Sequence, residues 1–260
     1  MNFPDPATAP RFLRQAPCAI AASECRAALR ASLPAVMNHL QEAAGLHAQA
    51  LGVGILELQA QGFTWMLGRL ALKINRLPAW QEPLSLATWP SGVKGRLLAE
   101  RQFALEAPSG ERLLEASSEW LYVNFRTGRL ARQPEAVLAL AAPETATFAL
   151  CTDRLPEPNL SAAPLAECRF AVRRAEIDAN GHVNNVHYAE WMLEALPEAT
   201  YFGANPIAFD IAYKQAAKLG DEVLVRTWAT APDRFTHAVC RAADGALLTY
   251  ATSAWQIARS

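Results

Sequence analysis

The chain is 260 residues long with a mass of 28.3 kDa, which suits one large domain or two small ones. Lys and Arg total 24 against 25 Asp and Glu, for a formal net charge of -1. This balance excludes a partner held by overall positive charge, such as nucleic acid or an anionic membrane surface. Hydrophobic residues make up 52% of the chain and charged residues 19%, which indicates a compact fold rather than a disordered one.

The start of the chain and its apolar stretches bear on location. Pro4, Pro6 and Pro10, together with the acidic Asp5, suit neither a secretory signal nor a transit peptide. No uncharged stretch approaches the roughly 18 apolar residues of a membrane-spanning helix. We therefore expect residues 1–15 to be a loose N-terminus, no membrane span, and a cytoplasmic protein.

The cysteines and histidines predict neither disulfides nor a metal site. The five cysteines are Cys18, Cys25, Cys151, Cys168 and Cys240. Their odd number and the lack of C-x-x-C spacing favour small apolar side chains in a reducing compartment. His39 and His47 lie two turns apart on a predicted helix, which is not a metal-ligand arrangement.

The first half of the chain predicts one long helix and then strands. Apolar residues recur at helical spacing at Met37, Leu40, Ala44, Ala48 and Leu51. Ser32 suits the N-cap of this helix, and Gly52 suits its end. Strands are predicted at residues 63–77, 84–89, 96–105 and 113–125, with turns at Ser91-Gly92 and Ser109-Gly110.

The second half follows a proline-rich connection and has the same plan. Residues 131–167 show little periodicity and predict a long linker. A strand at 168–174 precedes a helical stripe of Val183, Val186, Ala189, Leu193 and Leu196, which Pro197 ends. Strands are then predicted at residues 207–213, 223–230, 235–241 and 247–257.

Landmarks of the first half recur in the second. Thr88-Trp89 returns as Thr227-Trp228, and Trp120 returns as Trp255 at nearly the same spacing along the chain. Each half therefore predicts an antiparallel sheet wrapped around one long central helix, an α+β fold built twice. The expected domains are residues 16–130 and 168–260, joined by the linker.

A dense polar cluster lies between the strand at 168–174 and the second helix. Asp178, Asn180 and His182 supply a carboxylate, an amide and an imidazole at alternating positions. Placed just before a helix, they could activate a water and stabilise an oxyanion with hydrogen bonds. The alternative is that Asp178 and Asn180 only form the turn and its cap, which leaves His182 and the pair Asn184 and Asn185 unexplained.

The first half tests this alternative. Aligning Leu40 with Tyr188 maps the cluster onto Arg30, Ser32 and Pro34. None of these is a carboxylate or an imidazole, so the sequence predicts one chemical centre per chain. The first half is then free to enclose an apolar substrate, with Met37 and Leu40 on its helix as core or as pocket floor.

The cluster resembles a family signature. The run comprises Asp178, Asn180, His182, Val183, Asn184, Asn185, Val186, Tyr188 and Trp191, followed by Glu194 and Pro197. It resembles the acyl-acyl carrier protein thioesterases, whose two tandem hotdog domains form one chain. The resemblance extends from about Cys18 to Ile257 and includes the Ser118-Glu119-Trp120 strand.

The resemblance implies hydrolysis of fatty acyl thioesters on acyl carrier protein, without a metal or organic cofactor. It places Asp178, Asn180 and His182 at catalytic positions, with Asp178 as base or nucleophile. Met37, Leu40, Asn184 and Asn185 are then expected to contact the substrate. Because carrier proteins are acidic, a local basic face is expected. The basic residues near the site in sequence are Arg173, Arg174, Lys214 and Lys218. A homodimer is compatible with this prediction.

One departure from the family widens the functional alternatives. Ala216, three residues after Tyr213, occupies the position where the family often has a glutamate. That carboxylate would steady the catalytic water or the imidazole. Its absence keeps two alternatives open: a thioesterase for coenzyme A or polyketide-type acyl groups, and an acyl-binding or sensing protein without turnover.

Overall fold

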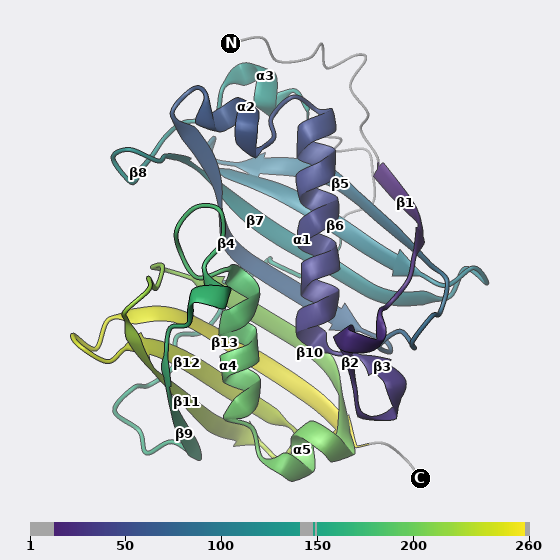
Figure 1. Ribbon diagram of the computed structural model, residues 1–260, viewed down its shortest axis with the longest axis vertical. Helices are drawn as coiled ribbons and strands as arrows, with labels where there is room; N and C mark the ends of the chain where they lie inside the picture. The colour runs from purple at the N-terminus through teal and green to yellow at the C-terminus, as the bar shows by residue number, and fades with distance from the viewer. Residues whose placement is uncertain (1–12, 141–147, 149, 258–260) are drawn as a thin grey trace. The chain divides into compact units, whose positions relative to one another are not determined.

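The computed structural model describes residues 13–140, 148 and 150–257 (Figure 1). The chain divides into two compact units, residues 1–152 and residues 153–260. Most of the expected loose N-terminus lies outside the described residues. Residues 13–15, which that prediction included, instead belong to the first strand of unit 1, where their backbone pairs with strand β5 (Leu84–Lys94).

Unit 1 contains one long helix and a sheet. Before the helix come β1 (Leu13–Cys18), the 3-10 turn η1 (Ala22–Glu24), β2 (Cys25–Arg26), η2 (Ala27–Leu29) and β3 (Arg30–Ala31). The helices are α1 (Leu33–Ala50), α2 (Ile55–Gln59) and α3 (Glu135–Leu138). The remaining strands are β4 (Phe63–Ile74), β5 (Leu84–Lys94), β6 (Leu98–Glu106), β7 (Arg112–Asn124) and β8 (Arg129–Leu130). The antiparallel sheet has the order β1-β5-β6-β7-β4, and β8 pairs with β7.

Helix α1 lies across one face of this sheet (Figure 1). It begins after Ser32, whose hydroxyl accepts a hydrogen bond from the Ala35 N–H at 3.2 Å, as the sequence predicts. Met37 and Leu40 are each only 1% exposed, so both belong to the packed interior. Burying such side chains stabilises the unit by about 1.5–3 kcal/mol each. Whether they also line a substrate pocket stays a prediction.

One predicted turn is wrong. Ser91-Gly92 lies inside β5, where the pairing with β6 shifts between Pro90 and Gly92. An extra residue of this kind makes a β-bulge, which bends a strand without ending it. The chain reverses at residues 95–97 instead, where Gly95 has a φ of +58°.

Unit 2 repeats the plan. It contains β9 (Ala166–Ala171), the 3-10 turn η3 (Arg174–Glu176), α4 (Asn185–Glu194), α5 (Glu198–Gly203), β10 (Ala204–Tyr213), β11 (Glu222–Ala231), β12 (Arg234–Arg241) and β13 (Leu247–Ile257). The antiparallel order is β10-β13-β12-β11-β9. Helix α4 is shorter than the predicted stripe, because Val183 and Leu196 lie beyond its two ends, although both are buried.

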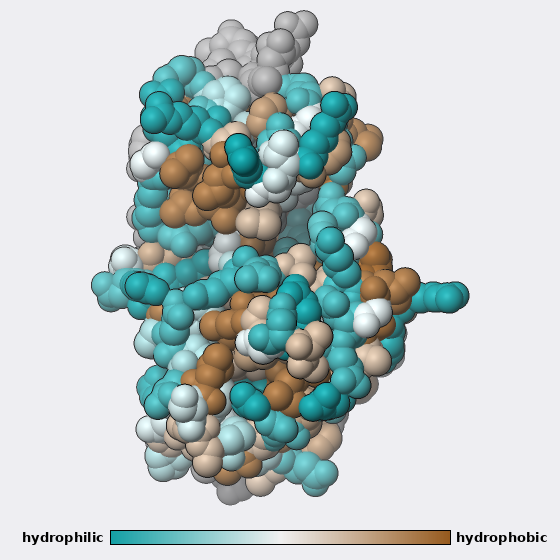
Figure 2. All heavy atoms as spheres, turned by 90° about the vertical axis from the view of Figure 1, so that its left-hand side faces the viewer, coloured by the Kyte–Doolittle hydropathy of each residue, from teal (hydrophilic) through white to brown (hydrophobic). Residues whose placement is uncertain are grey.

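Some large apolar side chains remain at the surface. Leu56 is 70% exposed and Phe202 68% exposed. On the face drawn in Figure 2, hydrophobic side chains lie in patches among hydrophilic ones. Within the ranges that the structure describes, none of the helices has the length and apolar character to cross a membrane.

The cap of α1 gives a first test. We predict that Ser32→Ala lowers the free energy of unfolding by about 1 kcal/mol, because the Ala35 N–H loses its acceptor. Chemical denaturation followed by far-UV circular dichroism measures the change. Asn38→Ala, at an exposed position of the same helix, serves as the control and should leave the midpoint nearly unchanged. Equal midpoints for wild type and Ser32→Ala would contradict the assigned cap.

Candidate active site

Asp178, Asn180 and His182 lie in a tight turn just before α4. An antiparallel bridge between Ile177 and Val183 closes the turn. Inside it, the Asp178 N–H donates to the His182 carbonyl at 2.8 Å, so these two residues lie opposite each other. Asp178 and His182 are partly buried, and Asn180 is exposed. The turn thus brings together the carboxylate and imidazole residues that the sequence singled out.

Part of the Asp178 side chain serves the turn itself. Its Oδ1 accepts a hydrogen bond from the Asn180 N–H at 2.7 Å, a local bond typical of aspartate in turns. Gly181 adopts a φ of +76°, which glycine reaches without strain. Over residues 13–140, 148 and 150–257, the other Asp178 oxygen and the His182 ring make no hydrogen bond. One carboxylate oxygen and the imidazole therefore retain their capacity for a ligand.

The paired asparagines have backbone roles. Asn184 is the N-cap of α4, and its Oδ1 accepts from the Val186 N–H at 3.1 Å. Asn185 is the first residue of the helix, and its carbonyl accepts from the Tyr213 hydroxyl at 3.1 Å. Neither contact was foreseen from the sequence. Substrate contact by the two asparagines stays a prediction.

Glu176 lies directly before the turn and is buried. Its carboxylate is 1% exposed and accepts from the Arg173 N–H at 2.7 Å, from Arg173 Nη2 at 2.6 Å and from Trp191 Nε1 at 3.2 Å. Burial alone would raise the pKa of the Glu176 carboxyl, but these hydrogen bonds outweigh it and hold the pKa below its ordinary value. With its oxygens occupied, Glu176 fixes the structure of the turn.

The loop after β10 contacts this turn. The Val183 N–H donates to the Ala217 carbonyl at 3.0 Å, and the Ala217 N–H donates to the Tyr188 hydroxyl at 2.7 Å. Burial, followed by nearby negative charge, raises the pKa of Tyr188 to about 12, so the phenol stays neutral. Ala216 therefore adjoins the turn but contributes only a methyl group. The supporting role of Tyr188 was not predicted, although this residue lies on the same helix four residues after the cap.

Unit 1 builds the same turn. The bridge between Cys25 and Ala31 corresponds to that between Ile177 and Val183. Likewise, the Ser32 N–H donates to the Glu24 carbonyl at 2.8 Å, and the Asn184 N–H donates to the Glu176 carbonyl at 2.9 Å.

These equivalent bonds align the two turns through their helix caps, Ser32 with Asn184. Leu40 then corresponds to Met192. The predicted alignment of Leu40 with Tyr188 is therefore wrong, because it matched short runs of similar residues rather than the N-cap residues of the two helices.

The corrected alignment changes the counterparts of the cluster. Asp178 corresponds to Arg26 and His182 to Arg30, while Asn180 corresponds to Ala28. These residues replace Arg30, Ser32 and Pro34, the counterparts that the sequence alone predicted. The turn in unit 1 thus keeps its backbone without carboxylate, amide or imidazole. Building the turn does not require those side chains, which favours a chemical role for them in unit 2.

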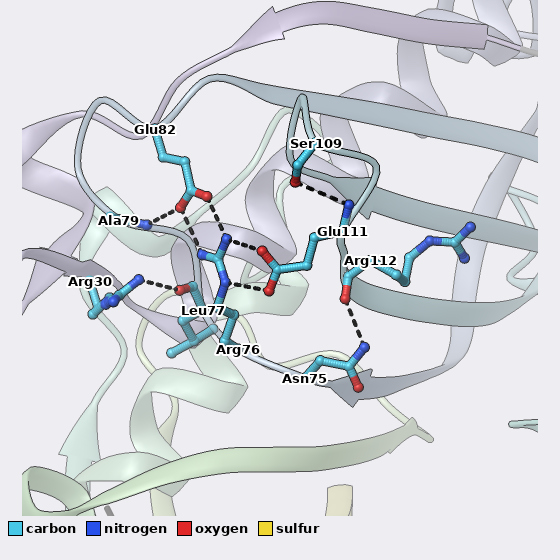
Figure 3. Close-up of polar contacts among 9 residues, drawn as sticks. All are labelled: Arg30, Asn75, Arg76, Leu77, Ala79, Glu82, Ser109, Glu111 and Arg112. Carbon is cyan, nitrogen blue, oxygen red and sulfur yellow. Dashed lines mark hydrogen bonds and ion pairs between the residues drawn. The ribbon is translucent and has the colours of Figure 1, made fainter.

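Figure 3 shows the surroundings of the unit 1 turn. Arg30 Nη1 donates to the Leu77 carbonyl at 3.3 Å. Leu77 is the counterpart of Ala216, because Arg76 N–H and Gln215 N–H bond to the equivalent carbonyls of Leu113 and Leu248. Since Arg30 is the counterpart of His182, the repeat places the positions of the imidazole and of Ala216 side by side.

Ion pairs fill the corresponding loop in unit 1 (Figure 3). Arg76 Nη2 lies 2.6 Å from Glu82 Oε1 and 2.7 Å from Glu111 Oε2. Hydrogen bonds to the carboxylates of Glu111 and Glu82 raise the pKa of Arg76. Glu82 also accepts from the Ala79 N–H at 2.8 Å, and so its carboxylate is committed to structure.

The described part of the chain contains no group of three or more His, Cys, Asp or Glu side chains arranged to hold a metal ion. The turn of unit 2 carries a carboxylate, an amide, an imidazole and backbone N–H groups. Such a set can orient a water and donate hydrogen bonds to a carbonyl oxygen that gains negative charge.

Comparison with known proteins agrees with this arrangement. The acyl-ACP thioesterase N-terminal domain model matches residues 15–141, and the C-terminal domain model matches residues 162–257. The chain belongs to the acyl-ACP thioesterase family. The two matches lie on the two halves of the repeat, and the expected resemblance is confirmed.

Curated members of the acyl-ACP thioesterase family are longer. The chloroplastic dodecanoyl-[acyl-carrier-protein] hydrolase of Cinnamomum camphora is 31% identical over 206 residues, which cover 74% of this chain and 53% of that protein. The chloroplastic palmitoyl-acyl carrier protein thioesterase of Arabidopsis thaliana is 29% identical over 177 residues, which cover 64% of this chain and 43% of that protein. The chain spans about half the length of these relatives.

Solved structures of acyl-ACP thioesterases share the fold. One from Bacteroides thetaiotaomicron has a TM-score of 0.83 at 23% identity, covering 95% of this chain and 98% of its own. The 12:0-ACP thioesterase of Umbellularia californica has a TM-score of 0.85 at 24% identity, covering 96% and 98%. The predicted α+β fold of tandem hotdog domains is confirmed.

Glu176 gives a test of the turn. We predict that Glu176→Gln lowers the free energy of unfolding at pH 7 by about 2 kcal/mol, because an amide replaces the buried charged acceptor of Arg173 and Trp191. Since the folded pKa of Glu176 is lowered, its contribution is full above the unfolded pKa and is lost as pH falls through the folded pKa. The difference between the two proteins should therefore shrink below about pH 4.

Thermal unfolding between pH 3 and pH 7 measures this difference. Glu190→Gln is a suitable control, because Glu190 pairs with His187 at a more exposed position of α4. A gap between wild type and Glu176→Gln that stays constant down to pH 3 would refute the linkage.

Proposed function

We propose that this protein hydrolyses fatty acyl thioesters of acyl carrier protein to the free acid and the carrier thiol. The observation that carries the proposal is the difference between two equivalent turns. Unit 2 has Asp178, Asn180 and His182 in a turn that unit 1 builds without such groups. Membership in the thioesterase family and the hydrolase names of its relatives support the same reaction.

In the proposed reaction, a water oxygen attacks the thioester carbonyl carbon. Asp178 takes the proton of this water as a general base. In the alternative route, the Asp178 carboxylate attacks the carbon first and expels the carrier thiolate, and water then hydrolyses the mixed anhydride to the free acid. Asn180 and His182 donate hydrogen bonds to the oxygen that becomes negative in the tetrahedral intermediate. The carbon–sulfur bond then breaks, and the carrier thiolate accepts a proton. No metal or organic cofactor takes part in this scheme.

The proposal gives the two units different tasks. Unit 1, whose turn lacks the polar cluster, encloses the acyl chain near Met37 and Leu40 on α1. Unit 2 carries the reacting groups, with Asn184 and Asn185 beside the substrate. An acidic carrier would meet the exposed Arg174 and Lys218, together with Arg173 and Lys214. A cytoplasmic location and a homodimer remain parts of the proposal.

Ala216 favours a second candidate. Without a glutamate at this position, the loop after β10 supplies no carboxylate from residue 216 to orient the imidazole or the water, which favours acyl binding without turnover. A thioesterase for coenzyme A or polyketide-type acyl groups is the third candidate, since the missing carboxylate leaves the acyl carrier open. A panel of acyl-carrier-protein and coenzyme A thioesters of different chain lengths separates the three.

We predict that Asp178→Ala lowers the hydrolysis rate of acyl-carrier-protein thioesters by at least about 100-fold. The released thiol, measured with a chromogenic disulfide, reports the rate. A melting temperature close to that of wild type shows that the variant folds, and Asp244→Ala, at an exposed turn of unit 2, is the control. If wild type turns over none of the panel yet binds acyl groups, the protein is a sensor and the hydrolase proposal fails.

Ala216→Glu tests the departure from the family. We predict that it raises the hydrolysis rate roughly tenfold, because the new carboxylate adjoins the His182 turn and can orient the imidazole or the water. Ala216→Gln is the matched control, since it adds the same volume without the charge. The same rate in all three proteins would mean that another group already fills this role.

A further inference from the structure

A second titratable cluster lies in unit 1, beside the turn that carries Arg26 and Arg30. The Cys18 sulfur, at the end of β1, is 3.3 Å from Nδ1 of His39 on α1. On the other side of the ring, Nε2 lies 3.0 Å from Glu24 Oε1 in η1. This second contact falls outside hydrogen-bond alignment, so it acts mainly through charge. The three side chains form a thiol–imidazole–carboxylate line.

The equivalent residues of unit 2 show which side chains occupy these positions where they serve packing alone. In the alignment through the helix caps, Cys18 corresponds to Phe170, since each pairs with the equivalent residue of the next strand, Leu84 or Val223. His39 corresponds to Trp191 and Glu24 to Glu176. In unit 2, the Phe170 and Trp191 rings are stacked with centroids 6.4 Å apart.

Unit 2 therefore fills these positions with two aromatic side chains, and Trp191 Nε1 donates to Glu176 Oε1 at 3.2 Å alongside the donors of Arg173. Unit 1 has the same carboxylate and the same helix position, but an imidazole replaces the indole and a thiol replaces the phenyl ring. Packing does not require this exchange. The exchange places a nucleophilic thiol, Cys18, beside a basic imidazole, His39.

The electrostatic surroundings of His39 in this cluster favour the protonated form of its imidazole ring. The hydrogen bond with the Cys18 sulfur, outweighing burial and helped by Glu24, raises the pKa of His39 to about 9. A protonated imidazole next to sulfur stabilises the thiolate, which is the reactive form of cysteine. The His39 and Glu24 side chains are 25% and 30% exposed, and Cys18 is partly exposed, so a small reagent can reach the cluster.

We infer that Cys18, His39 and Glu24 form a reactive thiol site at which Cys18 undergoes thiol–disulfide exchange with low-molecular-weight disulfides. This inference departs from the sequence-based interpretation of Cys18 as a small apolar side chain. His39 is the positioning residue that holds the proton, and Glu24 orients the charged ring. The site does not depend on the proposed hydrolase activity.

Atoms and electrons balance in this exchange with a symmetrical disulfide. The Cys18 thiolate attacks one sulfur of the reagent, forming a new sulfur–sulfur bond while the original one breaks. Cys18 becomes oxidised to the mixed disulfide, and the departing half of the reagent leaves reduced, as a thiolate. His39 keeps its proton through the exchange, and the negative charge passes to the departing sulfur.

Glutathione disulfide at pH 7 tests the site in the full chain. Mass spectrometry of peptides quantifies the modified fraction of each cysteine with time. Cys25 and Cys168 are also partly exposed and serve as internal controls in the same molecule. We expect Cys18 to react at least about tenfold faster than either control, because only its sulfur is held against an imidazole within the described residues.

Two variants separate reactivity from structure. His39→Gln should slow the modification of Cys18 at least about tenfold and leave Cys25 and Cys168 unchanged. His39→Trp, which installs the residue of unit 2, should slow Cys18 to the same extent. Wild type in which Cys18 reacts no faster than Cys25 overturns the inference without any variant. An unchanged Cys18 rate in either folded variant also overturns it.

Discussion

A backbone hydrogen bond found in both units joins the turn before the long helix to the loop after the first long strand. In unit 1 the Ala31 N–H donates to the Pro78 carbonyl at 2.9 Å, and in unit 2 the Val183 N–H donates to the Ala217 carbonyl at 3.0 Å. Main-chain groups make this bond, so it places few demands on the neighbouring side chains. The same backbone can therefore present Arg26 and Arg30 in one unit and Asp178 and His182 in the other.

Much of the fold could be predicted because the deciding signals are local. The cap at Ser32, the helical stripe that contains Met37 and Leu40, and the alternating strands of both halves are patterns within a few residues. The prediction of a turn at Ser91-Gly92 is wrong because β-bulges and turns use similar residues. Only the partner strand shows that β5 continues past this point to Lys94.

The candidate site could be predicted in part. Asp178, Asn180 and His182 stand close in sequence, and their residue types alone suggest chemistry. The supporting contacts join residues far apart in sequence: Tyr188 bonds to Ala217, 29 residues away, and Trp191 on α4 bonds to Glu176 in η3, 15 residues away. The line from Cys18 to His39 to Glu24 likewise joins a strand, a helix and a 3-10 turn, and no local pattern marks it. Such contacts follow from packing, which short-range periodicity does not encode.

The two loops beside the helix-start turns are fastened by different forces. In unit 1, Arg76 is held between Glu82 and Glu111, and these side chains are 31%, 17% and 49% exposed. In unit 2, Gln215 takes the place of Arg76, and the loop is held by the neutral Tyr188 hydroxyl. Dissolved salt screens partly exposed charges but leaves a buried neutral hydrogen bond nearly untouched. Ionic strength therefore acts on these two contacts unequally, loosening the Arg76 cluster of unit 1 while the hydrogen bond between Tyr188 and Ala217 in unit 2 keeps its geometry.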